Sequence, residues 1–492
     1  MSQGTFRLPR LEGEGGLEQS DTGQIQIVGA PPRDVEGLLA GRLASEAVYL
    51  TQQIGADSSV SHALAAVMAI EDAQGKPLAH NGLLLRDLLH GLSLLHAHLR
   101  NIYLTVLPDY LPPSALAGYK GNNPALLQQK QALLVRPKEG WQAFDFRHPF
   151  SQKQAEQLLE GRQRAIATMS VLQKMMARLG GKFPYVMSIV SGGVSIPVDE
   201  PLVLRLREYL SSVASFLESQ VAEDVALIVK AHPETKTLGR GGQMFLCVGS
   251  VGDVTGPDAS FFSRGVAMEE RLEAFIPQIT ESVETSFYKI PARRKSSSDI
   301  LIPAPGKAGA YSWIKAPRYK GLPVETGPLA RLVVTFQAGS RSHAAPVVGQ
   351  LESALGVQLA EVNTVAGRLM ATAGEIAPLT RRCMESLLGL LPGQPSVIQD
   401  DPERESGEGV AHIEGPAGSI RHKVVLRRGQ IVFYDIISPS TWNGSSQDEK
   451  GQQGALELAL NGKKTELSSA SGKSEVSKII HSYSFSASDA IH

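Results

Sequence analysis

The chain has 492 residues, of which only 2 are cysteine, and this excludes a small fold held together by disulfide bonds. Lys and Arg together number 48 and Asp and Glu 49, so the formal net charge is −1 and no basic surplus is present to bind nucleic acid or an anionic membrane. Hydrophobic residues make up 42% of the chain and charged residues 20%, as in a globular protein with a large core.

The chain opens with a predicted β ribbon, which helices follow. Alternating apolar and polar residues around a Gly- and Asp-rich middle predict a small antiparallel ribbon over residues 5–28. Apolar residues at helical spacing then predict helices over residues 35–53, 60–73 and 83–104. Ser58 or Ser59 is expected to cap the second of these helices, because a serine hydroxyl accepts a hydrogen bond from an N–H group of the first turn.

The rest of the chain is also mainly helical. Ser151 and Gln154 have the spacing of a capping box and Gly180–Gly181 is a stop signal, so a long helix is expected between them. Helical spacing recurs over residues 201–221, 268–287 and 346–390, whereas residues 224–230 and 329–336 are predicted to be extended. A turn at Arg428–Gly429 predicts a β hairpin over about residues 420–437.

Together these elements predict an α+β fold, mainly α, in a single domain over residues 1–492. The loops at residues 293–309 and 400–409 lie between helices long enough to pack together, so neither is read as a linker. The longest nearly apolar stretch, residues 60–70, is shorter than the roughly 18 to 20 residues that cross a bilayer, so no direct membrane insertion is expected. Because the first thirty residues contain no apolar signal segment, we expect a cytoplasmic location, or membrane association only through partners.

The residue types that usually carry chemistry form no recognisable motif. Cys247 and Cys383 are far apart and lie outside any metal-binding spacing, so both are expected to be buried thiols. His90, His96 and His98 fall on one predicted helix and are expected to be core or half-buried residues rather than metal ligands. Read in this way alone, the sequence does not reveal an active site.

Several segments, taken in order, follow one known pattern. The most specific is YSWIKAPRYKGLPVETGPLAR at Tyr311–Arg331. The supporting segments are Arg10–Gly16, Ser61–Ala73, His98–Tyr103, Gly180–Val194, Ser438–Gly451 and Ala490–His492. Through them the chain resembles, over essentially its whole length, the large subunit of nickel–iron hydrogenases. The resemblance implies the helical body of that family, with small peripheral antiparallel β elements.

In that family, two CxxC pairs bind nickel and an Fe(CN)2CO unit through four cysteinates. The resemblance places these four positions at residues that are not cysteine, namely Gly55, Ser58, Ser486 and Asp489. Two arginines expected near the metals are replaced in the same way, by Gln53 and Ala417. Because such soft metals need sulfur ligands, the chain is expected to have no nickel–iron centre. Asp57 and Asp489 are expected to replace the metal charge with local salt bridges.

Two other positions match the family. Glu36 and the terminal His492 correspond to the residues with which the family holds a magnesium ion, so the resemblance implies a magnesium site there. The alternative is a direct hydrogen bond or ion pair between the two side chains. In either case the end of the chain is expected to be buried close to Glu36.

The resemblance and the replaced cysteines together predict a function. The chain is expected to be a catalytically degenerate large subunit, not an active hydrogenase, that serves as a structural and electron-transfer subunit of an oxidoreductase complex. Its expected partners are an iron–sulfur small subunit, which would hold the iron–sulfur clusters, and further redox subunits, but no nucleic acid. Two alternatives are a maturation scaffold for the Fe(CN)2CO unit and an enzyme that uses the vacated pocket for another substrate such as a quinone.

Overall fold

A computed structural model describes residues 16–29, 33–135, 146–250, 261–269, 271–289, 301–339, 341–356, 358–398, 405–462 and 467–490. The helices are α1 (Val35–Leu39), α2 (Ala44–Leu50), α3 (Ser59–Gln74), α4 (His80–Arg100), α5 (Pro124–Val135), α6 (Gln152–Gly180), α7 (Glu200–Ser215), α8 (Val221–Ala231), α9 (Pro328–Gln337), α10 (Arg341–Leu355), α11 (Val365–Leu388), α12 (Pro439–Asn443), α13 (Ala455–Asn461), α14 (Ala470–Ser482) and α15 (Ala487–Ala490).

The strands are short and form small antiparallel sheets. They are β1 (Leu17–Gln19), β2 (Ile25–Ile27), β3 (Ile189–Val190), β4 (Gly193–Val194), β5 (Met244–Cys247), β6 (Gly265–Met268), β7 (Arg271–Glu273), β8 (Ile279–Ser282), β9 (Tyr288–Lys289), β10 (Ile302–Pro303), β11 (Ala316–Tyr319), β12 (Gly407–Gly415), β13 (Gly418–Arg427) and β14 (Gln430–Ile437). The two larger sheets have the orders β12-β13-β14 and β5-β6-β7, and the others are pairs. The predicted α+β fold, mainly α, is therefore confirmed.

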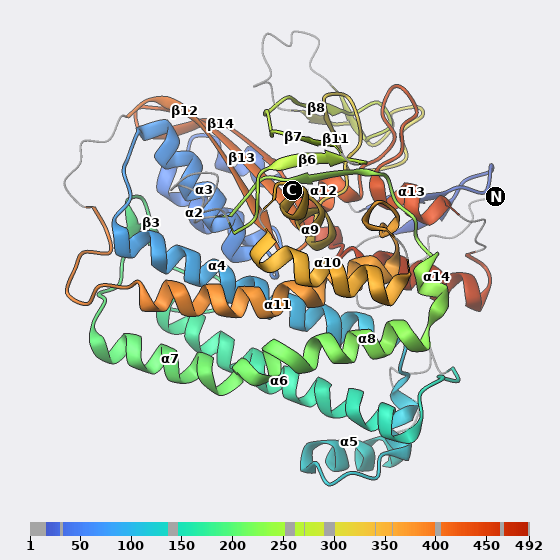
Figure 1. Cartoon of the computed structure of the whole chain (residues 1–492). Coiled ribbons are helices and arrows are strands. Elements are labelled where there is room, and N and C mark those ends of the chain that lie inside the picture. Colours follow the sequence, from blue (N-terminus) through green and yellow to red (C-terminus); the bar gives the residue numbers. More distant parts are fainter. Residues whose placement is uncertain are drawn as a thin grey trace.

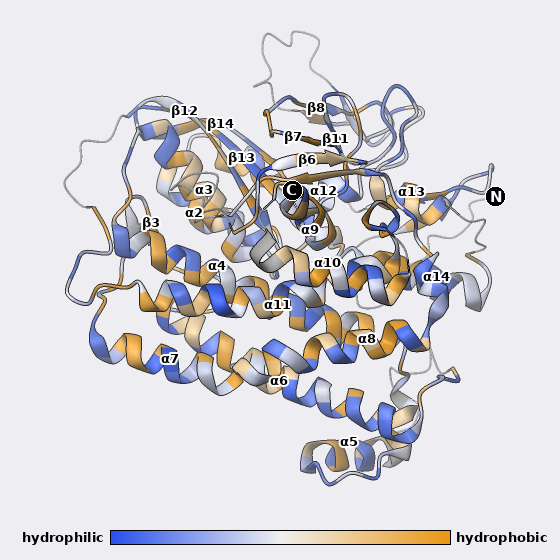
Figure 2. Cartoon of the chain, viewed as in Figure 1, coloured by the Kyte–Doolittle hydropathy of each residue, from blue (hydrophilic) through white to orange (hydrophobic). Residues whose placement is uncertain are grey.

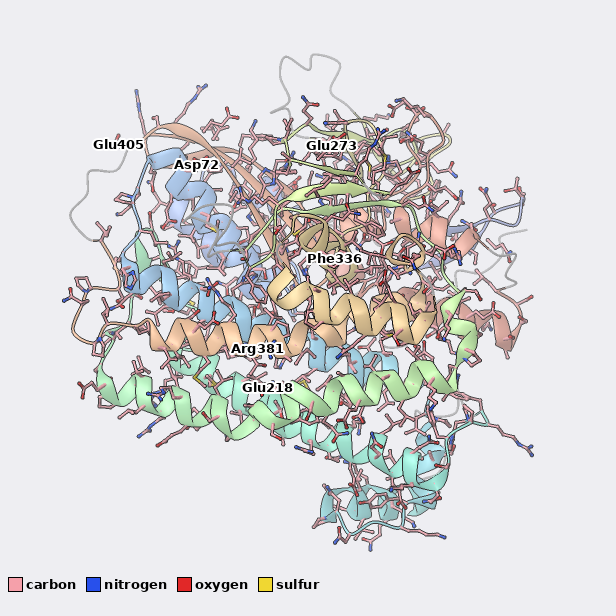
Figure 3. The ribbon with its side chains drawn as sticks, in the orientation of Figure 1. Asp72, Glu218, Glu273, Phe336, Arg381 and Glu405 are labelled. Atoms are coloured by element: carbon pink, nitrogen blue, oxygen red, sulfur yellow. The ribbon has the colours of Figure 1, made fainter. Side chains whose placement is uncertain are left out.

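Long helices form the body of the molecule. Figure 1 shows α4 and α11 side by side through its middle, with α6, α7 and α8 below them and α5 set apart at the bottom. Apolar and polar residues alternate around these helices in Figure 2, and charged side chains such as Glu218 and Arg381 point outward in Figure 3. Among the described residues, no helix combines the length and the apolar character that crossing a lipid bilayer requires.

Helix α6 is the element that local sequence determines best. The Ser151 hydroxyl accepts a hydrogen bond from the Gln154 N–H, and the Gln154 side chain accepts one from the Ser151 N–H, which is the predicted capping box. At the other end, Gly181 has a φ of 78°, a conformation that a side chain would strain. Both predicted boundaries of this helix are confirmed.

The three-stranded sheet packs on α3, and two glycines allow the close approach. A Cβ atom at Gly407 or Gly409 would lie 2.1 Å from the carbonyl oxygen of Ala73 or Ala69, so only glycine fits at these positions of β12. Helix α3 is buried almost all round because of this contact. The predicted hairpin over 420–437 is present as β13 and β14. Strand β12 is not predicted, because its glycines and the acidic residues before it are typical of a loop.

Three predicted elements are wrong. Residues 224–230, expected to be extended, lie in α8, which a π-helical turn at Phe216–Gln220 joins to α7. Residues 329–336 form α9, because Pro328 starts a helix whose sides are nearly all buried, and such an apolar run does not distinguish a helix from a strand. Residues 268–287, expected to be helical, contain β7 and β8. The pairing of β8 with β11 provides the backbone hydrogen bonds there, and this distant contact overrides the local pattern.

Two predicted helical segments are helical in the structure, but each is interrupted, and the predicted ribbon is described only in part. The helix expected over 35–53 is broken into α1 and α2 around Gly41, which has a φ of 82°. The segment 346–390 is divided into α10 and α11 by a 3-10 turn at Leu359–Glu361. Of the N-terminal ribbon, residues 17–27 form β1 and β2, whereas residues 5–15 lie outside the described residues.

One cluster of buried apolar side chains extends through the described chain from Leu17 to Ala490. It includes residues of the β ribbon, of the helical body and of the C-terminal helices. On this basis we propose that residues 1–492 form one domain, as the sequence predicts. The cluster also explains why the Ser-rich end of the chain is packed inside: Ile479, Ile480 and Tyr483 contribute to it.

Candidate functional site

A small pocket lies where α3, α4 and the end of the chain meet. Its volume is about 50 Å³, room for roughly three or four water molecules. The residues that line it are mainly polar: Asp57, Ser58, Ala97, His98, Arg100, Asn101, Thr105, Pro416, Ala417, Ser484, Phe485, Ser486 and Asp489. The segment that carries the last four is here called the C-terminal turn (residues 484–490).

The structure brings together the four residues for which the sequence predicts a lost thiolate. Ser58 Oγ donates to Asp489 Oδ1 at 2.8 Å, although 431 positions separate the two residues. A Cβ atom at Gly55 would lie 2.8 Å from Ser58 Oγ and 3.2 Å from Asp489 Oδ1, so Gly55 adjoins this pair. Ser486 Oγ accepts from the Asp489 N–H at 3.3 Å. Ser58 is the N-cap residue of α3, but it makes no capping hydrogen bond, so the expected capping role is wrong.

Hydrogen bonds from several elements fix the C-terminal turn. Arg33 donates to the carbonyl oxygens of Gln53 at 2.9 Å, Ile54 at 2.5 Å and Ser488 at 2.9 Å, and so ties the segment before α3 to the turn. On the other side, the Ser486 N–H donates to Ser440 Oγ at 3.1 Å in α12. Both halves of the pocket are therefore held by contacts that no local sequence pattern reveals.

Asp57 and Arg100, which both line the pocket, form an ion pair. Arg100, at the end of α4, donates to an oxygen of Asp57, and both side chains are partly exposed. Burial raises the pKa of Asp57 above its usual range, the positive charge of Arg100 acts against this, and the carboxylate of Asp489 adds to it. Asp57 thus has the predicted salt bridge, and its carboxyl group is a proton acceptor of increased basicity.

A chain of buried hydrogen bonds leads from Asp489 into the protein. Asp489 Oδ1 lies 3.0 Å from His62 Nε2, His62 Nδ1 lies 2.9 Å from His422 Nε2, and His422 Nδ1 lies 2.8 Å from the Tyr434 hydroxyl. The contacts are all satisfied if Tyr434 donates to His422, His422 to His62, and His62 to the carboxylate, which is an assignment of tautomers. The expected salt bridge of Asp489 is therefore a contact with His62.

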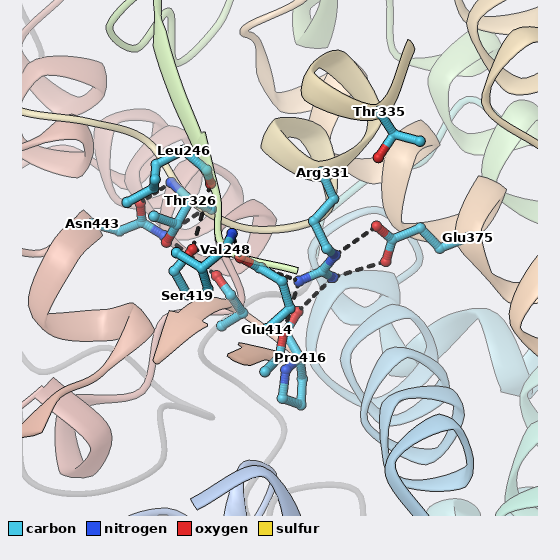
Figure 4. A network of polar contacts seen from close by, with 12 residues as sticks. Leu246, Val248, Thr326, Arg331, Thr335, Glu375, Glu414, Pro416, Ser419 and Asn443 are labelled. Atoms are coloured by element: carbon cyan, nitrogen blue, oxygen red, sulfur yellow. Dashed lines mark hydrogen bonds and ion pairs between the residues drawn. The ribbon is translucent and has the colours of Figure 1, made fainter. Parts of the chain in front are cut away.

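A second buried network starts from His98 in the pocket wall. Figure 4 shows its inner part, with Arg331 between Glu375 and Glu414. His98 Nε2 lies 3.0 Å from Glu375 Oε2, and both oxygens of Glu375 accept from Arg331 at 2.8 Å. Arg331 also donates to Glu414 at 3.0 Å and to the carbonyl oxygen of Gly415 at 2.7 Å. The two negative charges beside it raise the pKa of Arg331, against the effect of burial, so the guanidinium remains charged.

The remaining predicted site residues are dispersed. Ala417 lines the pocket, whereas Gln53 is exposed and contributes only its carbonyl oxygen to Arg33. Glu36 lies in α1, where its carboxylate accepts from Lys315 Nζ at 3.1 Å and from the Ile436 N–H at 2.9 Å. Burial raises the pKa of Glu36 to about 7. His492 lies outside the described residues, so its contact with Glu36 and the shared magnesium ion stay predictions.

The two cysteines are not part of the pocket. Cys247 ends β5 and Cys383 lies in α11, and both are buried, as expected. Burial raises the pKa of the Cys383 thiol, so it is not a ready metal ligand. Within the described ranges, no group of three or more His, Cys, Asp or Glu side chains has an arrangement that could hold a metal ion.

Comparison with known proteins gives the class of protein. The family model described as nickel-dependent hydrogenase matches residues 33–145 and 146–492, so the chain belongs to this family. The large subunit of the periplasmic [NiFeSe] hydrogenase of Desulfomicrobium baculatum is 26% identical, and the match covers 87% of this chain and 82% of that subunit. The hydrogenase-1 large chain of Escherichia coli K12 is 25% identical, with 97% and 92% covered.

The fold comparison agrees. The Ni-Fe-Se hydrogenase of Desulfovibrio vulgaris Hildenborough in the reduced state superposes with a TM-score of 0.83 at 25% identity, covering 99% of this chain and 100% of that one. The [NiFeSe]-hydrogenase of Desulfomicrobium baculatum gives a TM-score of 0.82 at 24% identity. The helical body with small antiparallel sheets is thus the fold of a hydrogenase large subunit, as the resemblance implies.

These findings correct two expectations. Relatives and matching structures are named as hydrogenases, so they contradict the assignment of the chain as a catalytically degenerate, structural and electron-transfer subunit. They equally contradict the expectation that the chain has no nickel–iron centre, because the family model is that of nickel-dependent hydrogenases. What the comparisons support is a hydrogenase-type function. One relative is named periplasmic, so the expected cytoplasmic location stays a prediction.

Proposed function

We propose that this chain is the large subunit of a hydrogenase-type oxidoreductase and that its chemistry takes place at the pocket beside α3, α4 and the C-terminal turn. The observation that carries the proposal is the match of the family model to residues 33–145 and 146–492. The relatives are named large subunits or large chains. We therefore propose an iron–sulfur small subunit as the partner, with further redox subunits in the complex.

We further propose that Gly55, Ser58, Ser486 and Asp489 occupy the positions at which the family has cysteines. Their spacing supports this assignment, because each pair is separated by two residues and the pairs come from distant segments that meet at one pocket. Ala417, in the pocket wall, supports the corresponding assignment of a lost arginine.

The donor chemistry of these residues does not fit a nickel–iron group held by thiolates. They offer hydroxyl and carboxylate oxygens, and both cysteines lie elsewhere in the fold. No step is therefore derived through that group. What the pocket residues themselves can do is bind and pass protons, since Asp57, Asp489 and the histidines behind Asp489 all hold protons reversibly.

Asp57 is the first proton acceptor that the geometry supports. It faces the pocket with a raised pKa, and the Arg100 guanidinium orients its carboxylate. Asp489 lies deeper in the same pocket, and from it hydrogen bonds lead inward to His62 and His422. Proton transfer of this kind is one half of hydrogen chemistry, and the electrons are assigned to the partner subunit.

The test is to co-express the chain with the iron–sulfur small subunit proposed as its partner, purify the complex and measure hydrogen-dependent reduction of a viologen dye. We expect a stable complex with dye reduction that Asp57→Asn lowers at least about tenfold, as loss of a proton-transfer group does. Asp21→Asn, at an exposed turn, is the matched control and should leave the rate unchanged. A stable complex without any hydrogen-dependent reduction would overturn the proposal.

A further inference from the structure

His98 is a buried imidazole whose surroundings determine which nitrogen carries the proton. It lies in α4, is 1% exposed and forms part of the pocket wall. Its Nε2 atom lies 3.0 Å from Glu375 Oε2. The contact places Glu375, in α11, between His98 and Arg331 in α9, so helices distant in sequence fix the ring in one orientation.

Glu375 remains a carboxylate and can only accept hydrogen bonds. Burial raises its pKa, but the Arg331 guanidinium and the bond from His98 outweigh this and lower the pKa of Glu375 to about 2. Two parallel hydrogen bonds of 2.8 Å hold it against Arg331. His98 Nε2 must therefore carry a hydrogen, which leaves the lone pair of a neutral ring on Nδ1.

The Nδ1 atom is the part of His98 available to the pocket. It makes no hydrogen bond within the described part of the chain, and it is not among the fully buried atoms there that lack a partner, so it keeps some accessible surface. The open space that His98 lines is the pocket. A carboxylate behind an imidazole, with the other nitrogen facing a cavity, is the usual arrangement of a base whose tautomer is fixed.

We propose that His98 is a base of this pocket, with Nδ1 accepting a proton and Glu375 and Arg331 acting as positioning residues. This inference deepens the proposed function and depends on it for the source of protons. In the step, an N–H bond forms at Nδ1 and an O–H bond of a protonated pocket water breaks, leaving neutral water. The Glu375 carboxylate lies beside the imidazolium that forms. Because the step moves only a proton, no oxidant or reductant is needed.

Several charged groups lie around His98. They are the carboxylates of Glu375 in α11 and Glu414 in β12 and the guanidinium groups of Arg331 in α9 and Arg100 in α4. Across the pocket, Asp57 and Asp489 add negative charge. His90 and His96 face other partners, since His90 Nε2 contacts the Glu414 carbonyl oxygen and His96 Nε2 contacts Gln173.

The first experiment measures the tautomer without any turnover. In the complex with ¹⁵N-labelled histidine rings, long-range nitrogen–proton spectra of the wild type and His98→Gln assign the His98 signals. We expect the neutral ring to carry its hydrogen on Nε2 and none on Nδ1. Glu375→Gln should favour hydrogen on Nδ1, because the amide donates to Nε2. Hydrogen on Nδ1 of the wild type would overturn the proposal.

The second experiment measures function. Gln at position 98 places its amide where Nε2 was and keeps a donor for Glu375, so His98→Gln removes the base with little effect on packing. We expect a loss of at least about tenfold in hydrogen-dependent dye reduction and loss of one ionisation from its pH profile. His96→Gln is the matched control, expected to change neither. An unchanged pH profile in His98→Gln would refute the base, whereas an inactive wild type would refute only the proposed function.

Discussion

Glu457 provides a sharp test of how burial controls stability. This residue of α13 is 0% exposed, and its carboxyl group contacts the Ile27 N–H at 3.1 Å and the Tyr311 hydroxyl at 2.9 Å. Burial raises its pKa from the ordinary value of 4.5 to about 8, although both hydrogen bonds act in the opposite direction. The folded state therefore keeps this proton over a pH range in which the unfolded chain has already lost it.

The sign and size follow from linkage. Because the folded-state pKa is the higher one, stability is fully present below pH 4.5 and is lost as the pH rises through about 8. At 1.36 kcal/mol per pH unit the complete loss is about 5 kcal/mol, of which about 2.5 kcal/mol falls between pH 6 and pH 8.5. Glu457→Gln keeps the acceptor oxygen and removes the charge, so it should abolish this part of the pH dependence.

Urea unfolding followed by tryptophan fluorescence at pH 6 and pH 8.5 measures the difference. The variant should gain stability over the wild type by about 2.5 kcal/mol more at the higher pH than at the lower one. Glu284→Gln, at an exposed position, is the control and should show the same pH dependence as the wild type. If the gain of the Glu457 variant is the same at both pH values, the carboxyl group is already ionised in the folded protein and the reasoning fails.

Three further predictions concern the contacts around the site and the best-defined helix. Arg331→Met should lower the free energy of unfolding by about 3 to 5 kcal/mol, because it leaves Glu375 and Glu414 as unpaired buried charges, and Arg331→Lys should recover part of this in urea unfolding. Arg33→Met should increase hydrogen exchange in the C-terminal turn, measured by mass spectrometry, with no change in α6. Ser151→Ala should cost about 1 kcal/mol in the same unfolding assay, and no loss would show that the capping box adds nothing.

Whether a helix or strand could be predicted from the sequence depends on how far apart along the chain the residues that determine it lie. The boundaries of α6 were predictable because Ser151, Gln154 and Gly181 act on their own neighbours. Helix α8 and strand β8 were not, because a continuation of α7 and a pairing with β11 decided them. Local pattern thus succeeds where the determining contacts are local, and it fails where a distant partner completes the hydrogen bonding.

The same distinction applies to the site. The resemblance named Gly55, Ser58, Ser486 and Asp489, and the structure brings these four residues to one place. The resemblance gave no role to His62 or His422, nor to the pairing of His98 with Glu375. From its helix alone, His98 is expected to be a core or half-buried residue, since a histidine reveals its function only through the partners of its two nitrogens.

The pocket is closed by contacts between the two ends of the chain, and this determines when it can form during synthesis. Ser58 and His62 are made early, whereas their common partner Asp489 follows 431 and 427 positions later. The ribosome adds residues at about 5 to 20 per second, so the α3 side of the site is without the C-terminal turn for tens of seconds. During that interval its polar groups face water or a chaperone. A chain that stops before the C-terminal turn would have most of its helices but no pocket.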